Sequence, residues 1–488
     1  MARGEQPVDH LLRRAGFGAT ATDLAAYSGQ SLSNVIESLL EYQRQPDDID
    51  TKIGQPDHVA VTTRGQFSPN TNIDDARQRW LFRMVHSRRP LQEKMALFWH
   101  NHFGVGYSKV AGAFGALQGT KMMALKAGEL PGAQGHIELL RQRATGKFRE
   151  LLLEVARDPA MIVFLDGRTN TRARPQENFG REIMELFTFG LGNYFEQDVY
   201  AAARVFTGWN LRQGNGFNNN NDPNSDYEFF YNAAQHDTTA KTFSFAVMPD
   251  GSKTIPARSA AGGMQDGIDF INALSRHPAT ARRLAGKLWD FLVSELTPAP
   301  KAFLDEVVDV YLRQDTDMKP VLDYILRSPW FLDPANYYTR YSWPAEFVVR
   351  AIKETGWLGF SVDTARTPLT NMGQTLFEPP DVAGWDLGQS WFSTGSMLAR
   401  MNFAATLAAN QRFNLARLVP PVSRATPERL VDFFLDRLSP MRYDADPHQA
   451  MTAYVRAGAN YTGTDAQVST KAPSVVRLIL GSAEYQFV

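Results

Sequence analysis

The stretch Leu32-Ser33-Asn34-Val35-Ile36-Glu37-Ser38-Leu39-Leu40 indicates the fold class. Its apolar residues recur three, four, seven and eight positions after Leu32, so they share one face of an α-helix. Ser31 or Ser33 stands where a side-chain oxygen caps the first free N–H groups of such a helix. Similar spacing returns through most of the chain. It predicts a mainly α-helical protein built as one large body.

One segment, residues 212–255, departs from the helical pattern. It begins rich in Asn and Gly and then becomes aromatic, with Tyr227, Phe229, Tyr231 and the run 242–247 reading as short strands. We therefore expect a helical part at 1–211, a small β-hairpin insertion at 212–255 and a second helical part at 256–488, with the two helical parts packed together. Further helices are expected at 73–84, 90–104, 137–157, 177–190, 196–207, 263–276, 279–295, 300–313, 318–327, 342–355, 393–409 and 426–438.

Composition excludes several classes of function. The chain has 488 residues, with 51 Lys+Arg against 52 Asp+Glu, and this near-neutral balance argues against nucleic-acid binding. No cysteine is present, which excludes disulfides, thiolate metal sites and a cysteine nucleophile. Any metal must therefore be held by the nine histidines and by carboxylates. No window approaches the roughly 20 apolar residues that cross a bilayer. The start lacks a hydrophobic signal core, so the protein is expected to be cytoplasmic or to have lost a leader.

The most informative candidate site lies in the segment 176–190. On a helix, Asn178, Arg181, Glu182 and Glu185 share one face, whereas the aromatic and aliphatic residues lie on another. Two carboxylates one turn apart can chelate a cation, or can divide acid and base roles. The alternative is a solvated face on which Arg181 pairs with neighbouring acids.

His100 and His102 form the second candidate site. Residues two apart point in different directions on a helix, but Gly104 indicates that the helix is ending, and in an extended chain both rings lie on one side. Two imidazoles and a Glu from elsewhere suit zinc, iron or manganese. The alternative is a pair of satisfied histidines beside a Trp/Phe cluster.

Weaker candidates follow from local context. His236-Asp237 precedes Lys241 in a loop that can present polar groups to a cleft. Arg13 and Arg14 are adjacent, and clustered arginines recognise carboxylate, phosphate or sulfate. The chain has no dinucleotide fingerprint, no Walker loop, no G-x-S-x-G elbow and no H-E-x-x-H helix.

Several ordered motifs resemble one bacterial family, the domain of unknown function 1800, over nearly the whole chain. They are the stretches 10–18, 98–105, 177–188, 197–199, 203–209 (ending at Trp209), 236–241, 277–281, 372–380, 384–385 and 398–403. The resemblance implies no established reaction, and it implies export for many members, which are encoded beside a sulfatase-like partner family. Gln176 replaces a common Asn, and Phe187 replaces a common His. Any family mechanism that uses that His is therefore in doubt for this chain.

The leading hypothesis is a metal-assisted, hydrolase-like enzyme acting on a polar or anionic envelope or extracellular substrate, such as a glycan. A divalent metal ion would be its cofactor, held by His100, His102, Glu182 and Glu185. The candidate catalytic residues are Glu182, Glu185, His100 and His236. The candidate substrate-binding residues are Arg13, Arg14, Arg181, Asn178, Asp237, Lys241 and Trp209.

Two alternatives belong to other classes. The Glu/Arg/His cluster can be a structural polar network in a non-catalytic envelope or assembly protein. The same carboxylates can also act without metal as a glycosidase-type acid and base, which requires two carboxyl groups about 5–5.5 Å or 6.5–9.5 Å apart. Access to a cleft distinguishes these readings, because a catalytic group must reach substrate.

Overall fold

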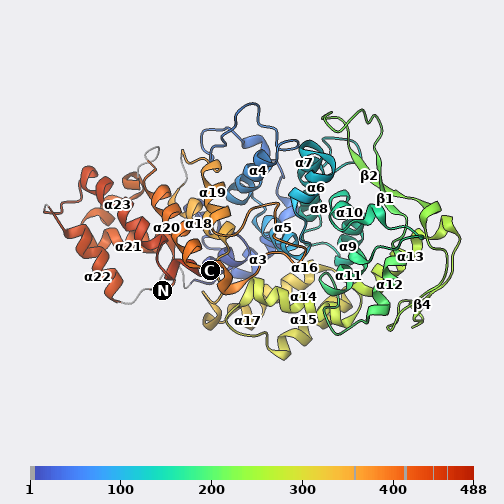
Figure 1. Cartoon of the computed structure of the whole chain (residues 1–488). Coiled ribbons are helices and arrows are strands. Elements are labelled where there is room, and N and C mark those ends of the chain that lie inside the picture. Colours follow the sequence, from blue (N-terminus) through green and yellow to red (C-terminus); the bar gives the residue numbers. More distant parts are fainter. Residues whose placement is uncertain (1–5, 357–358, 411–414, 443–444, 459) are drawn as a thin grey trace.

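The fold is mainly α-helical, as predicted. The computed structural model describes residues 6–356, 359–410, 415–442, 445–458 and 460–488. Within these ranges, strands occur as two small two-stranded antiparallel sheets. The β1–β2 hairpin lies at one end of the molecule and the helices α21–α23 at the other (Figure 1). In the described part of the chain, no helix is long and apolar enough to cross a membrane.

The helices fall into three stretches along the chain. The first contains α1 (Pro7–Arg14), α2 (Ala21–Tyr27), α3 (Leu32–Leu40), α4 (Ile73–His86), α5 (Pro90–His102), α6 (Tyr107–Phe114), α7 (Ala116–Ala124), α8 (His136–Gln142), α9 (Phe148–Arg157) and α10 (Pro159–Phe164). The second contains α11 (Glu177–Glu185), α12 (Glu196–Val205), α13 (Met264–Ser275), α14 (Pro278–Leu288), the π-helix η7 (Trp289–Val293), α15 (Lys301–Arg313), α16 (Met318–Arg327) and α17 (Pro329–Leu332). The third contains α18 (Pro344–Thr355), α19 (Asp363–Asn371), α20 (Thr394–Ala408), α21 (Pro427–Leu438), α22 (Ala445–Arg456) and α23 (Asp465–Leu480).

Local chemistry explains where these helices begin. Ser31 caps α3, because its hydroxyl accepts a hydrogen bond from the Asn34 N–H at 3.2 Å. Pro90 opens α5 as expected, and a proline also occupies a first helical position in α14 and α18. The helix expected at 137–157 is instead two helices, α8 and α9, with Gly146 in the turn between them.

The β-hairpin starts earlier than the predicted insertion. Strand β1 (Trp209–Gln213) pairs with β2 (Tyr227–Tyr231), with Trp209 opposite Tyr231. The strand expected at 242–247 is much shorter in the structure. Strand β3 (Lys241–Thr242) pairs with β4 (Thr254–Ile255) over two residues each. Ser244 leaves the sheet: its N–H and hydroxyl both donate to the Asp198 carboxylate, at 2.7 and 2.6 Å.

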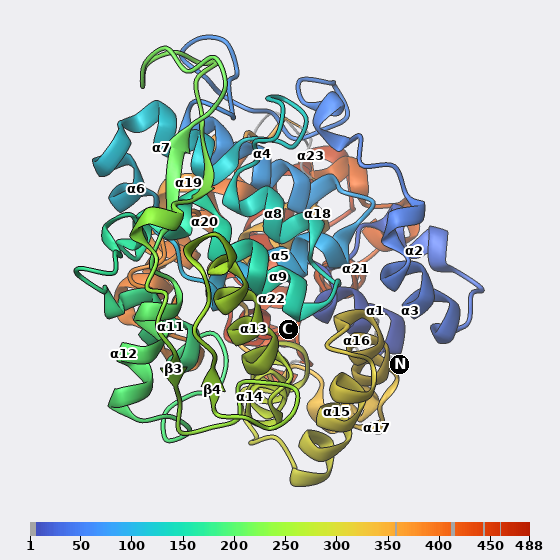
Figure 2. The ribbon, with the colours of Figure 1, turned by 90° about the vertical axis from the view of Figure 1, so that its right-hand side faces the viewer.

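Helices from distant parts of the chain share the core. Helix α3 packs against α16, α4 against α18, and α9 against α13. Helix α5 lies near the middle of both views, with every residue buried except Pro90 and Asn101 at the edge of burial (Figures 1 and 2). The division at 1–211, 212–255 and 256–488 stays a prediction. What matters for the site is that residues at the ends of α5 and α11 and along α14 line adjoining cavities.

Candidate functional site

An open cleft runs between the end of α5, the end of α11 and helix α14. It consists of two adjoining cavities of about 280 and 540 Å³, which share Leu186 and Arg283. The smaller cavity is lined by Phe98, Asn101, His102, Leu186, Arg283, Lys287, Asp290, Phe291, Trp343, Ala383, Trp385, Asp386 and Leu387. The larger is lined by Glu185, Leu186, Phe189, Gly190, Leu191, Asn193, Ala279, Arg282 and Arg283.

Helix α14 and the π-helix that follows it supply the charged wall of the cleft. The helix begins at Pro278, and Nδ1 of His277 accepts a hydrogen bond from the Ala279 N–H at 3.1 Å. After Leu288 the helix widens into the π-turn η7, closed by the Ser294 N–H donating to the Trp289 carbonyl at 3.0 Å. Single π-turns occur frequently at functional sites. Here Lys287 stands just before the π-turn, and Asp290 lies within it.

Lys287 is held by a neutral histidine rather than by an acid. Its Nζ lies 3.1 Å from Nδ1 of His102, and Nε2 of His102 lies 3.1 Å from the Phe187 carbonyl oxygen. The Phe187 carbonyl requires the N–H on Nε2, which leaves Nδ1 as the acceptor for Lys287. Burial and the neighbouring Lys287 and Arg283 charges hold the pKa of His102 well below its usual value. Burial, together with Arg283, lowers the pKa of Lys287 to about 7.

Arg283 lies one helical turn before Lys287 and also faces the cleft. Its Nε donates to the Leu186 carbonyl oxygen at 3.3 Å, and burial lowers its pKa. Within the part of the chain that the structure describes, no carboxylate forms an ion pair with Arg283 or Lys287. Arg283 and Lys287 therefore face the cleft without an ion pair to a described carboxylate, and Glu185 and Asp290 act on them only over longer distances.

Asp290 completes this wall. Its side chain is open to the cavity, but the surrounding protein replaces part of its hydration shell and raises its pKa to about 6, against the opposing effect of Arg340 and Lys287. An amine with a pKa of about 7 and a carboxyl with a pKa of about 6 are suited to exchanging protons near neutral pH.

The opposite wall is a loop fastened to the end of α5. Gly384 has φ +91°, and a Cβ there would lie 2.2 Å from the Asn101 carbonyl oxygen. Gly104 is constrained by space alone, because a Cβ there would lie 2.6 Å from the Asp381 carbonyl oxygen. The Trp385 N–H donates to Oδ1 of Asn101 at 2.6 Å. This close approach places Trp385 and Asp386 at the cavity.

The floor is aromatic and lies over buried charge. Phe98, Phe291, Trp343 and Trp385 are each less than 5% exposed. The Arg340 guanidinium lies 4.7 Å from the Phe291 ring centroid and donates to both carboxylate oxygens of Glu346, at 2.8 and 2.7 Å. Lys94 pairs with the same carboxylate.

Glu185 faces the larger cavity, whereas Glu182 lines neither of the two cavities. Glu185 accepts a hydrogen bond from the Tyr194 hydroxyl. Burial, Glu185 and Asp381 raise the pKa of the half-buried Glu182. The other two polar residues of the predicted face bind elsewhere: Arg181 pairs with Glu196 at 2.5 Å, and the Asn178 amide donates to Asp166 at 3.1 Å.

The expectation that His100 and His102 lie on one side is wrong, because α5 remains helical through His102. His102 faces the cleft. His100 is fully buried, with its ring against Trp80 and Trp385 and 6.2 Å from the ring centroid of His136. Across the described ranges, no group of three or more His, Asp or Glu side chains is placed to hold a metal ion. The predicted ligand set of His100, His102, Glu182 and Glu185 is therefore not assembled.

The loop at 236–241 belongs to a buried network. Nε2 of His236 lies 3.1 Å from Asp266, and Lys241 pairs with the same carboxylate at 2.5 Å. Asp237 pairs with Arg204 at 2.8 Å. Trp209 is 3% exposed, and its indole packs at the start of the hairpin. None of these four predicted site residues lines the cleft.

Arg13 and Arg14 are also buried. Arg13 pairs with Asp9 and lies 4.2 Å from the Tyr338 ring centroid. Arg14 donates to the Asn336 carbonyl oxygen at 2.8 Å. Both are internal cations of the core rather than lining residues of the cleft.

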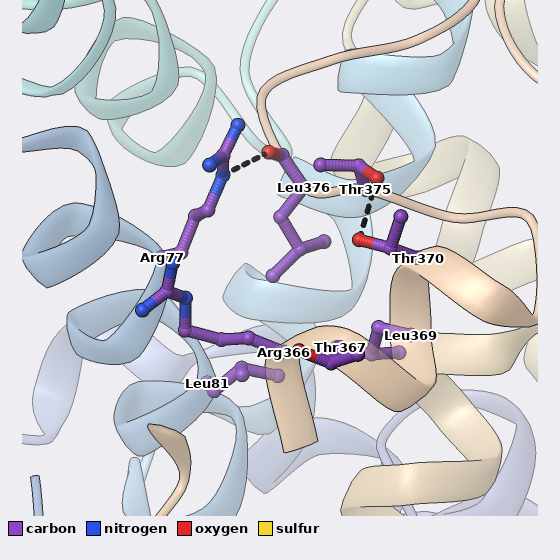
Figure 3. Close-up of a pocket in the computed structure, with 8 residues that line it drawn as sticks. All are labelled: Arg77, Leu81, Arg366, Thr367, Leu369, Thr370, Thr375 and Leu376. Atoms are coloured by element: carbon purple, nitrogen blue, oxygen red, sulfur yellow. Dashed lines mark hydrogen bonds between the residues drawn. The ribbon is translucent and has the colours of Figure 1, made fainter. Parts of the chain in front are cut away.

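A further cavity, of about 150 Å³, lies between α4 and α19 (Figure 3). Arg77 and Arg366 reach it from two sides, and Nε of Arg77 donates to the Leu376 carbonyl oxygen at 3.0 Å. Both guanidiniums pair with Asp74, and Arg366 also pairs with Asp363 at 2.7 Å. Their charge is thus already neutralised, which makes this cavity a weaker candidate than the cleft.

Sequence reasoning missed Arg283, Lys287, Asp290 and Asp386. The first three read as the polar face of an ordinary amphipathic helix, at spacings of four and three. The available signal was indirect: the stretch 277–281 that opens α14 belongs to the ordered motifs, as do 98–105, 177–188 and 384–385, and all four stretches contribute to this cleft or its support.

The fold and the site thus define a mainly helical protein with an open, polar cleft built from distant motifs. The model of a protein family of unknown function, DUF1800, matches residues 10–487, and the chain belongs to that family. Searches of curated proteins and of solved structures find no significant match.

Proposed function

We propose that the chain is an acid–base enzyme whose active site is this cleft. The observation that carries the proposal is the placement of Lys287. Its amine faces the smaller cavity, lacks a carboxylate partner among the described residues and is held by a neutral His102. Lys287 would accept a proton and Asp290 would donate one, since the two titrate close to neutral pH.

The substrate that fits best is polar and negatively charged. Arg283 supplies positive charge in the wall without an ion pair among the described residues, beside the Asp290 and Asp386 carboxyl groups, and Arg340 lies beneath the aromatic floor. Aromatic floors suit ligands with an apolar face, such as a sugar ring. A polar or anionic glycan-like molecule therefore remains the substrate class we propose. Neither role requires a metal ion.

A specific observation favours glycoside hydrolysis as a second candidate. Asp290 and Asp386 line the same cavity from two different elements, η7 and the loop after Gly384. Two carboxyl groups that face one sugar can act as the acid and the base of a glycosidase. Asp386→Asn would then abolish turnover as completely as Asp290→Asn. In the leading proposal it would leave most of the turnover intact.

A structural polar network, of the kind that the non-catalytic alternative describes, occurs at other residues. His236, Lys241 and Asp266 are fully buried and mutually paired, as a structural network requires. Lys287 differs because it reaches a cavity. The structural polar network and the proposed active site are therefore different parts of the molecule.

The test is turnover of a panel of anionic sugars and glycans by the purified full chain. Lys287→Met and Asp290→Asn are compared with Lys319→Met, a substitution in a partly exposed pair with Glu41. We expect losses of about 10²-fold or more in the first two variants, and none in the control. Unchanged turnover in both cleft variants would refute the proposal.

A further inference from the structure

The surroundings of Lys287 differ from those of three buried lysines of the chain. Lys94 pairs with Glu346, and Lys241 pairs with Asp266. Lys121 donates to backbone carbonyl oxygens, including that of Pro223 at 2.7 Å. Lys287 differs from all three, because its amine has no carboxylate or carbonyl partner among the described residues and opens onto a cavity of about 280 Å³.

A neutral, accessible lysine amine beside another cation is the arrangement that favours attack on carbonyl carbon. Arg283, four residues earlier on the same helix face, is that cation. It also gives the cavity a fixed point for an anion, since a guanidinium binds carboxylate or phosphate through two parallel hydrogen bonds. One site therefore offers an anion-binding group and a nucleophile one helical turn apart.

We propose that Lys287 forms a Schiff base with a carbonyl substrate that carries an anionic group, which Arg283 binds. The inference rests on the proposed function and names the class of its substrate. The Lys287 nitrogen forms a bond to the carbonyl carbon, and the carbonyl π electrons move to oxygen, which takes a proton from the Asp290 carboxyl group. The nitrogen returns one proton to the Asp290 carboxylate, which gives a neutral carbinolamine. The nitrogen lone pair then expels the hydroxyl group, which takes that proton back from Asp290 and leaves as water. The iminium loses its remaining N–H proton to the Asp290 carboxylate, so one amine and one carbonyl give one imine and one water.

His102 is a positioning residue in this scheme. Its Nδ1 accepts a hydrogen bond from the amine and fixes the direction of the lone pair, while the Phe187 carbonyl oxygen fixes the ring. Buried and neutral, His102 adds no charge that would compete with Arg283 for the anion.

The experiment is reductive trapping on the purified full chain. Pyruvate, which joins a ketone to a carboxylate, is compared with 2-butanone, a neutral ketone of similar size. Cyanoborohydride reduces any imine to a stable secondary amine, and peptide mass spectrometry then assigns the modified lysine. The variants are Lys287→Arg, Arg283→Gln and a control, Arg276→Gln, which removes an exposed partner of Asp315.

We expect pyruvate to label Lys287 at least about tenfold more than any other lysine at pH 7, because an ordinary lysine is almost entirely protonated there. Lys287→Arg should abolish this labelling. Arg283→Gln should lower labelling by pyruvate several-fold more than labelling by 2-butanone, which falls only as far as the pKa of Lys287 rises without the neighbouring charge. Arg276→Gln should change neither. Circular dichroism checks that each variant is folded.

Two results would overturn the inference. Labelling of Lys287 no greater than that of surface lysines would exclude the nucleophile. Equal loss with both ketones in Arg283→Gln would exclude the anion-binding role. Turnover distinguishes failure of the Schiff-base inference from failure of the proposed function. If Lys287→Met loses turnover but no imine is trapped in the wild type, the Schiff base is excluded and Lys287 remains the proposed base. Trapping without any loss of turnover in Lys287→Met or Asp290→Asn refutes the acid–base proposal alone.

Discussion

The Nζ atom of Lys287 and the Nδ1 atom of His102 lie 3.1 Å apart, although the two residues are 185 positions apart in the chain. The contact joins the last residue of α5 to the end of α14. It places in the cleft an amine that contacts an imidazole and forms no ion pair with a described carboxylate. Function and stability should both depend on it.

Replacing Lys287 by methionine should change the pH dependence of stability. In the folded protein the pKa of Lys287 is about 7, whereas in the unfolded chain it is near the ordinary value of about 10.4. Between these values the unfolded state binds one more proton, so the free energy of unfolding of the wild type rises with pH. Relative to Lys287→Met, it should rise by roughly 1–3 kcal/mol from pH 7 to pH 10. Chemical denaturation at several pH values measures this difference, and parallel curves would contradict it.

Gly384→Ala should damage the cleft from the side of the loop. The added Cβ would overlap the Asn101 carbonyl oxygen, and the backbone there has φ +91°. We expect a loss of about 2 kcal/mol or more in the free energy of unfolding. Gly112→Ala, in α6, is the control, because nothing lies within 4 Å of its Cβ position. It should stabilise the protein by about 0.5–1 kcal/mol. An unchanged free energy of unfolding in Gly384→Ala would contradict this expectation and show that the loop can move away from Asn101.

His100→Phe should be close to neutral or slightly stabilising. Neither ring nitrogen of His100 has a hydrogen-bond partner among the described residues, and its surroundings are aromatic. An apolar ring of similar shape removes two unsatisfied groups, an effect of about 1 kcal/mol. The same variant tests the metal hypothesis by mass spectrometry of metal content. Stoichiometric metal in the wild type that is lost in His100→Phe would restore a metal site there.

Glu346→Gln should be strongly destabilising. Its carboxylate is 1% exposed and neutralises both Lys94 and Arg340 beneath the cleft floor. Removing it leaves two buried cations without their partner, with an expected loss of about 3–5 kcal/mol. Glu428→Gln breaks an exposed pair with Arg456 and should leave the denaturation midpoint unchanged. Similar midpoints for the two variants would contradict this account of the buried cluster.

Much of the helical architecture could be predicted from the sequence. Helices with a strong apolar stripe, such as 318–327 and 426–438, lie within one residue of their expected bounds. Helices α6 and α7, and the C-terminal α22 and α23, were not predicted. The hairpin was found through its aromatic residues, but the length of its second sheet depends on Asp198, 46 residues before Ser244. Such a contact has no local signature.

The site was harder to predict than the fold. His102 and Glu185 were singled out, and both line the cleft. Arg283, Lys287 and Asp290 were not, because charged residues spaced along an amphipathic helix usually face solvent. What makes Lys287 unusual is the absence of a carboxylate partner and the presence of His102, and both are properties of tertiary structure. His236 was predicted as a site residue because a loop position suggested exposure. The structure buries its side chain instead.

The proposed chemistry requires Lys287 to be a neutral, reactive amine in an open cleft. The most direct measurement is the titration of the Lys287 ε-carbon by nuclear magnetic resonance in protein labelled with ¹³C-lysine, with Lys287→Arg identifying its signal. We expect a midpoint near pH 7, well separated from the midpoints of the exposed lysines. A midpoint near 10, together with the exposed lysines, would contradict it.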